Sequence, residues 1–155
     1  MKLWGIAAVA LMLAGCGTKY QDMGFTGGVA AEQISSDTWR IVSRGNAYTS
    51  AETVQDYVLL KAAETTQAQG GTHFVIVGEN QANQAVQITS GGSAQTTFSG
   101  NTAYTSYSPP VTSTVIKPGQ NVYIKVLRLG PSQQAQGAIS AAEIVQFTGA
   151  RVKRG

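Results

Sequence analysis

The chain of 155 residues holds one cysteine and one histidine, so thiol or imidazole chemistry must use Cys16 or His73. Cys16 follows the apolar run Leu3 to Leu13 (LWGIAAVALML) after only Ala14 and Gly15. A thiol nucleophile at this place, with small residues beside it, suits acylation at a membrane face followed by cleavage of the preceding segment. A single cysteine also excludes a disulfide within the chain and a cysteine-based metal site.

The apolar run has the length and flanks of a secretory signal segment. Lys2 precedes it, and it is too short for a transmembrane helix, which needs about 20 residues. Leu13-Ala14-Gly15-Cys16 resembles the bacterial lipobox, in which the cysteine is the lipidation site. We therefore predict a lipoprotein signal peptide over residues 1–15 and a membrane anchor on Cys16.

The residues after Cys16 predict the location and the domain organisation. Gly17 stands where an aspartate commonly retains lipoproteins in the inner membrane, which favours the inner leaflet of the outer membrane, facing the periplasm of a Gram-negative bacterium. A lipid anchor of three chains is sufficient for stable attachment. We expect a lipidated flexible tether over 16–28, a single domain over 29–150, and a basic tail over 151–155.

Charge gives no indication of a nucleic-acid partner. The net charge is +3, the pI is about 9.1, and only 12% of residues are charged. The basic residues are scattered except in the tail, whereas a phosphate-binding surface needs a dense stripe of them.

No catalytic or metal-binding constellation is visible in the sequence. His73 sits at the start of a predicted strand, where a structural role is the commoner one. The carboxylates form no paired motif, and the soft ligands are too few for zinc. We therefore predict no catalytic residues, no metal site and no cofactor, although carboxylates remote in sequence could still form a glycosidase pair.

The pattern predicts an α+β fold, mainly an antiparallel sheet with one long helix packed on one face and a short C-terminal helix. Strands over 29–34 and 38–44 form a hairpin. Thr49-Ser50-Ala51-Glu52 fits a capping box, which begins a helix from Ser50 to about Ala68. His73 to Val77 is predicted as a central strand covered on both faces.

The second half of the chain is less regular. A weaker strand contains Val86 and Ile88, and the Gly/Ser/Thr-rich segment 90–108 is predicted as a loop or ragged edge strands, with an extended hairpin as the alternative. Strands over 112–117 and 121–129 are expected to be joined by a type II turn at 117–120, because it carries Pro-Gly at its centre. A terminal helix is expected over 139–147.

One leucine departs from the amphipathic pattern of the predicted long helix. Leu60 falls within the polar arc, near Asp56, Glu64 and Gln67. These four residues are a candidate partner surface, in which an apolar anchor lies inside a polar rim. The competing account places Leu60 in the core, beneath segment 90–108. Lys61 falls within the apolar arc, where its stem is expected to lie along the core edge.

About a third of the chain is similar to a family of small proteobacterial outer-membrane lipoproteins of unassigned function. The matching pattern runs through Gly27-Gly28, Glu32, Trp39-x-Ile41, Gly45-Asn46-x-x-Thr49, Leu59-Leu60-Lys61-Ala62-Ala63-Glu64-Thr65 and Gly71-x-x-Phe74. The sequence departs from the pattern at Val29, where an aromatic residue is usual, at Ser43, where a large apolar one is common, and at Lys61 for Arg. The resemblance implies a location and a fold but no reaction.

The sequence therefore predicts a membrane-anchored periplasmic lipoprotein with a non-catalytic binding or scaffolding role for an envelope protein or glycan. The alternatives are an envelope glycan hydrolase of the peptidoglycan type and an accessory subunit of a secretion or surface-fibre assembly. Carboxylates converging in one cleft would favour the hydrolase, and carboxylates spread over the surface would favour the binding role.

Overall fold

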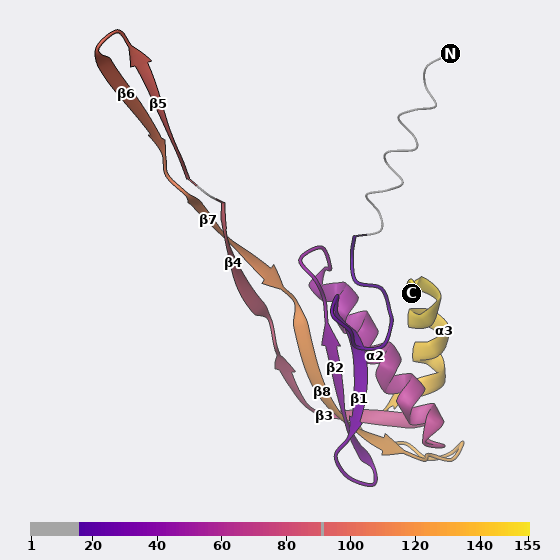
Figure 1. Ribbon diagram of the computed structural model, residues 1–155. Helices are drawn as coiled ribbons and strands as arrows, with labels where there is room; N and C mark the ends of the chain where they lie inside the picture. Colours follow the sequence, from indigo (N-terminus) through magenta and orange to yellow (C-terminus); the bar gives the residue numbers. More distant parts are fainter. Residues whose placement is uncertain (1–15, 91) are drawn as a thin grey trace, which may run out of the picture. The chain divides into compact units, whose positions relative to one another are not determined.

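A computed structural model describes residues 16–90 and 92–155 (Figure 1). The chain forms two compact units, whereas the sequence predicts one domain over 29–150. One, the main unit, contains the chain up to Gln84 together with Lys117–Gly155. The other, the hairpin unit, is Ala85–Ile116. The predicted signal peptide, with Leu13, Ala14 and Gly15, lies outside the described residues.

The main unit is built on an antiparallel sheet of five strands. These are β1 (Gly28–Gln33), β2 (Thr38–Arg44), β3 (His73–Gln81), β8 (Gly119–Leu127) and β9 (Ile139–Ser140), in the spatial order β1-β2-β8-β3-β9. The predicted hairpin is confirmed, since β1 and β2 pair from Gly28↔Arg44 to Gln33↔Trp39. Strand β8 pairs with both β2 and β3, which makes it the centre of the sheet.

Two helices complete the unit, α2 (Ala51–Ala68) and α3 (Ala141–Arg151), and the predicted fold class is confirmed. The cap of α2 is Ser50, not Thr49. The Ser50 hydroxyl accepts a hydrogen bond from the amide of Thr53 at 3.1 Å. The Thr49 hydroxyl instead accepts one from the amide of Thr18, so a tertiary contact has moved the cap by one residue.

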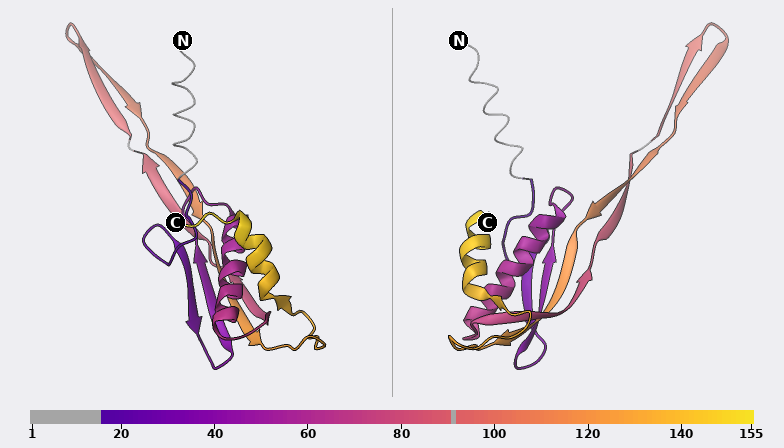
Figure 2. Two further views of the ribbon diagram at one scale, coloured as in Figure 1. Left: turned by 90° about the vertical axis from the view of Figure 1, so that its right-hand side faces the viewer. Right: turned by 180° about the vertical axis from the view of Figure 1, so that it is seen from behind.

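Helix α2 lies between the sheet and α3 (Figure 2). Its sheet-facing side contributes Val58, Ala62 and Ala63 to the main core. The sheet contributes fully buried side chains from three strands: Ile41, Phe74, Val122 and Ile124. The sequence of β8 alternates, and Val122, Ile124 and Val126 on its inward side are all buried.

Strand β3 is not covered on both faces, as the sequence had suggested. Phe74 is fully buried, but Ile76 is 39% and Val77 58% exposed. The register with β8 shifts between Ile76 and Gly78, which interrupts the alternation of faces at that point. The continuous apolar run in β3 therefore marks a bulged strand, and not a strand whose two faces are both covered.

The expected type II hairpin at 117–120 is also absent. Strands β7 (Val111–Lys117) and β8 follow each other directly but take different partners, β4 (Gln84–Ser90) for β7 and β2 and β3 for β8. The backbone of the connection is bound elsewhere: the carbonyl of Pro118 accepts from the Gly45 amide at 2.8 Å, and that of Gly119 from the Ala82 amide at 2.8 Å. Pro118 and Gly119 are therefore bound to other segments and do not close a hairpin between β7 and β8.

The hairpin unit consists of regular strands where a loop or ragged edge had been predicted. Strand β5 (Ser93–Ser99) pairs antiparallel with β6 (Thr102–Ser108) in unbroken register. Gly100 and Asn101 form the turn, and Gly100 has a φ of 61°, the left-handed conformation that a two-residue hairpin turn requires. Among the residues described in the chain, neither helix is both long and apolar enough to cross a membrane.

Val58→Asp tests the phase of α2. Val58 is buried against the sheet, so an unpaired carboxylate there should lower the free energy of unfolding by about 3–5 kcal/mol. The exposed position Gln55 on the same helix is the matched control, and Gln55→Asp should change it by less than about 0.5 kcal/mol. Denaturant titration of the helical circular dichroism signal measures both, and equal stability of the two variants would contradict this packing.

Candidate functional site

The candidate lipidation residue lies where the described fold begins. Cys16 is exposed, and its backbone carbonyl accepts a hydrogen bond from the side-chain amide of Asn46 at 2.8 Å. Thr18, only two residues later, is buried. The expectation of a flexible tether over 16–28 is therefore wrong, because this segment packs on the main unit and forms part of its core.

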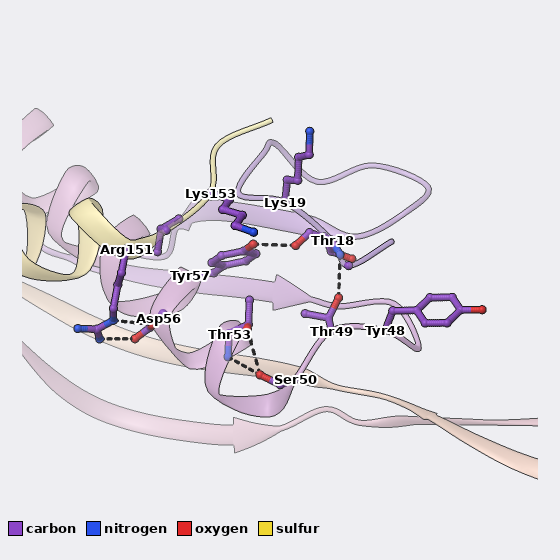
Figure 3. A pocket seen from close by; sticks show the side chains of 12 residues that line it. Thr18, Lys19, Tyr48, Thr49, Ser50, Thr53, Asp56, Tyr57, Arg151 and Lys153 are labelled. Atoms are coloured by element: carbon purple, nitrogen blue, oxygen red, sulfur yellow. Dashed lines mark hydrogen bonds and ion pairs between the residues drawn. The ribbon is translucent and has the colours of Figure 1, made fainter. Parts of the chain in front are cut away.

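Thr18 is held by hydrogen bonds at each of its polar groups, and Figure 3 shows those to Thr49 and Tyr57. Its amide donates to the Thr49 hydroxyl at 2.9 Å, and its carbonyl accepts from the Tyr57 hydroxyl at 2.7 Å. Its own hydroxyl donates to the carbonyl of Thr26 at 2.8 Å and accepts from the backbone amide of Asn46 at 2.9 Å. Four bonds to one buried residue fix the chain directly after Cys16.

The Gly45-Asn46-x-x-Thr49 pattern builds this socket for Thr18. The Asn46 side-chain carbonyl accepts from the Thr49 hydroxyl and from the Tyr48 amide, each at 2.9 Å. A Cβ atom at Gly45 would lie 2.7 Å from Cβ of Thr49, so only glycine allows this approach. Gly45, Asn46 and Thr49 thus dock the segment that follows Cys16.

Tyr20 makes the second attachment and joins the two ends of the chain. Its amide donates to the carbonyl of Lys153 at 2.9 Å, and its carbonyl accepts from the amide of Gly155 at 3.2 Å. Its hydroxyl donates to Glu64 on α2, and Arg154 donates to the same carboxylate at 2.9 Å. The guanidinium of Arg154 also lies 5.2 Å from the centre of the Tyr20 ring. The predicted basic tail is therefore bound to the fold through Arg154.

The environment of Tyr20 keeps its hydroxyl protonated. Burial of the side chain raises its pKa most, and the hydrogen bond to Glu64 raises it further. The positive charge of Arg154 opposes the rise without cancelling it. A neutral hydroxyl is the form that can donate to Glu64, so the electrostatics and the hydrogen bond agree.

The candidate partner surface around Leu60 is covered by the chain itself. Leu60 is fully buried, in a cluster with Tyr20, Val29 and Tyr57. Asp56 binds Arg151 of α3 at 2.7 and 2.9 Å, and Glu64 binds Tyr20 and Arg154. Of the four proposed residues only Gln67 is exposed. The interpretation of Leu60 as an exposed anchor is wrong, since residues 16–28 (the N-terminal segment) and α3 cover this side of the helix.

Lys61 behaves as its position on the helix predicted. Its side chain is largely covered, and its ammonium group lies 3.8 Å from the Asp22 carboxylate. Helix α2 thus contacts residues 16–28 at three positions, through Leu60, Lys61 and Glu64. Val29 and Ser43 are cross-strand partners in β1 and β2, and both are buried.

A cleft of about 340 Å³ opens between the N-terminal segment, the start of α2 and the end of α3 (Figure 3). It is lined by Gly17, Thr18, Lys19, Tyr48, Thr49, Ser50, Thr53, Asp56, Tyr57, Arg151, Val152 and Lys153. Asp56 neutralises Arg151, which leaves Lys19 and Lys153 as its net positive charges. The cleft is therefore suited to an anionic or hydroxyl-rich group, and it starts at the residue next to Cys16.

Asp22 and Glu64 line one further hollow together with Lys61, and each of these two carboxylates is held by a basic side chain, Asp22 by Lys61 and Glu64 by Arg154. The carboxylates of Asp22, Glu32, Asp37, Asp56 and Glu64 each lie in a separate ion pair with a lysine or arginine. No group of three His, Cys, Asp or Glu residues among those described could hold a metal ion. His73 contacts the hydroxyl of its neighbour Thr72 at 3.0 Å.

No family model, curated protein or solved structure matches this chain.

Leu60→Ala separates the buried from the exposed role of this residue. Removing a fully buried leucine side chain should lower the free energy of unfolding by about 2–5 kcal/mol. Gln67→Ala, at the exposed position of the same four, should change it by less than about 0.5 kcal/mol. If Leu60→Ala unfolds at the same denaturant concentration as wild type, the second buried side of α2 does not exist.

The raised pKa of Tyr20 predicts a loss of stability at alkaline pH. Below its ordinary value of 10.0 the hydroxyl is protonated in both states, and the contribution to stability is fully present. As the pH rises further, the unfolded chain ionises first, so this contribution is lost. Tyr20→Phe should therefore show a shallower fall of melting temperature above that pH.

Tyr57 retains part of the alkaline effect in that variant, because burial raises its pKa too. Tyr48→Phe, at an exposed position, is the control and should follow the wild-type curve. Parallel curves for wild type and Tyr20→Phe would show that Tyr20 is not held protonated by the fold.

Proposed function

We propose that the protein is a lipoprotein anchored through Cys16, with a non-catalytic binding or scaffolding role in the cell envelope. The observation that carries this proposal is the position of Cys16: its side chain is exposed, while the fold closes around Thr18 two residues later. An acyl-bearing residue must be accessible to lipid, and Cys16 is exposed while Thr18 and Tyr20 shortly after it are buried. The chain context of Cys16, behind the Leu13-Ala14-Gly15 sequence, supports the same reading.

The docked N-terminal segment gives this anchor a particular consequence. A lipoprotein with a long tether can reach partners far from the bilayer, whereas this segment leaves no free spacer between Cys16 and the main unit. The cleft with Lys19 and Lys153 would then lie at the level of the lipid headgroups. Basic residues near an anionic surface contribute about 1 kcal/mol each, which would add to the lipid anchor.

A binding role agrees with the charges better than the glycan hydrolase does. A hydrolase of this type needs two carboxyl groups facing one cleft, about 5–10 Å apart. In the cleft beside Cys16 the carboxylate is Asp56, and it is engaged by Arg151. Asp22 and Glu64, which share another hollow, are likewise ion-paired, and this favours a binding or scaffolding role over hydrolysis. We further propose the periplasmic face of the outer membrane as its location, because Gly17 follows Cys16, and membership of the lipoprotein family on the sequence resemblance alone.

The accessory-subunit alternative has one observation in its favour. The hairpin unit presents Phe98, Tyr104 and Tyr107 with more than half of each side chain exposed. Exposed aromatic residues on a regular strand pair are a common feature of interaction surfaces. An assembly role is therefore our second candidate, and it is compatible with the same lipid anchor.

Replacement of the thiol tests the anchor. In a Gram-negative host, Cys16→Ser should abolish labelling by a palmitate analogue and remove the mature protein from the outer-membrane fraction. Lys19→Ser is the matched control, because it changes a neighbouring residue outside the predicted motif and should leave labelling intact. Labelling of Cys16→Ser at the wild-type level would overturn the proposal.

A further inference from the structure

The hairpin unit carries no charged side chain. Between Glu79 and Lys117 there is no Asp, Glu, Lys or Arg, whereas the chain as a whole is 12% charged. Natural proteins protect exposed strand edges with charged residues, above all lysine, because an uncharged edge pairs readily with another strand. The charged residues that could protect such edges all lie in the main unit. The two-stranded ribbons of the hairpin unit therefore have uncharged edges that are open to pairing with another strand.

The edges of the ribbon are free in the described chain. Strands β5 and β6 bind each other and no other described strand, and the same is true of β4 and β7. Each strand therefore presents a row of unpaired amide and carbonyl groups on its outer side. A ribbon of only two strands is at best marginally stable in water, so a further strand on either edge would stabilise it.

The two faces of β5 and β6 differ in polarity. One face holds the pairs Ala94–Tyr107, Thr96–Thr105 and Phe98–Ala103, and the other holds Ser93–Ser108, Gln95–Ser106, Thr97–Tyr104 and Ser99–Thr102. Every residue of both strands is exposed. The first face is partly apolar and has nothing over it, so a larger sheet would bury it more effectively than a ribbon does.

We infer that the hairpin unit is a self-assembly element, which adds the β5 or β6 edge of one copy to that of a second copy of this chain. Two uncharged edges are self-complementary, since backbone pairing needs no particular side chain and no like charges face each other. Ser, Thr and Gln side chains in register can add hydrogen bonds between strands, as Thr96 and Thr105 do at 2.9 Å. This inference goes beyond the proposed function and holds whether or not Cys16 is acylated.

A lipid bilayer is a less suitable partner for this ribbon. The apolar face has a threonine pair at its centre, and hydroxyl groups without a partner strand are costly in hydrocarbon. Strands that cross a bilayer have about 9–11 residues, whereas β5 and β6 have 7 residues each. The length and the central threonines both favour a second copy of the chain.

Paired lysine substitutions test the inference in the full chain carrying Cys16→Ser, purified in a mild non-ionic detergent. Thr97→Lys with Ser106→Lys puts one charge on each strand, on the polar face and outside the Thr96–Thr105 pair. The charge-matched control is Gln55→Lys with Gln67→Lys on α2, where both positions are exposed. Since all proteins share residues 1–15, a difference between the two double variants reports the hairpin alone.

Sedimentation should show the parent chain and the helix variant as assemblies of at least two copies of the 16.2 kDa chain, which dissociate on dilution. The hairpin variant should be a monomer at the same concentrations, with unchanged helical circular dichroism. Amide hydrogen exchange in β5 and β6 should be slowed at least tenfold in the assembled parent relative to the hairpin variant. A monomeric parent chain, or equal assembly of both double variants, would overturn the inference.

Neutral phosphatidylcholine vesicles supply the test for lipid. If the parent chain is monomeric and co-sediments with these vesicles while the hairpin variant does not, the ribbon binds a bilayer and the self-assembly inference is wrong. Assembly of the parent without vesicles supports it. Because the whole experiment uses Cys16→Ser, a failure of the proposed lipid anchor leaves its result unchanged.

Discussion

Helix α2 is buried on two sides, and the rest of the main unit depends on this arrangement. The sheet covers one side through Val58, Ala62 and Ala63, while the N-terminal segment and α3 cover Leu60 on the other. A helix that is apolar on two sides cannot be stable with one partner layer, so the docking of both chain ends is part of the folding of the unit. Glu64 unites these contacts, because its carboxylate binds Tyr20 near one end of the described chain and Arg154 near the other.

This architecture changes the meaning of the anchor. In a lipoprotein with a free tether, the position of the domain above the bilayer is set by chain entropy. Here the Thr18 socket fixes the chain immediately after Cys16, so an acyl group on that residue would bring the main unit and its basic cleft directly to the headgroups. The socket is formed by Asn46, Thr49 and Tyr57, which are polar residues without a catalytic arrangement. Their role in the fold is to hold Thr18 in place.

The two units divide the chemistry of the chain between them. The main unit contains every charged residue described, and five carboxylates are used in ion pairs that tie its elements together. The hairpin unit has no charge and no buried core of its own among the residues of β5 and β6. With the proposed acylation of Cys16 and the proposed self-assembly of the hairpin unit, the protein would hold an assembling element at a membrane.

The sequence by itself determined the elements whose signals are local. The β1–β2 hairpin follows from alternation, the start of α2 from its capping signal to within one residue, and the inward residues of β8 from their period of two. Tertiary structure decided the rest. Leu60 looked exposed because a helical wheel assumes one buried side, and residues 16–28 looked free because Gly-rich composition does not reveal a hydrogen-bonded socket. Pro118-Gly119 looked like a turn, but its carbonyls are bound by Gly45 and Ala82. In each case the deciding contact joins residues distant in sequence, which no local pattern records.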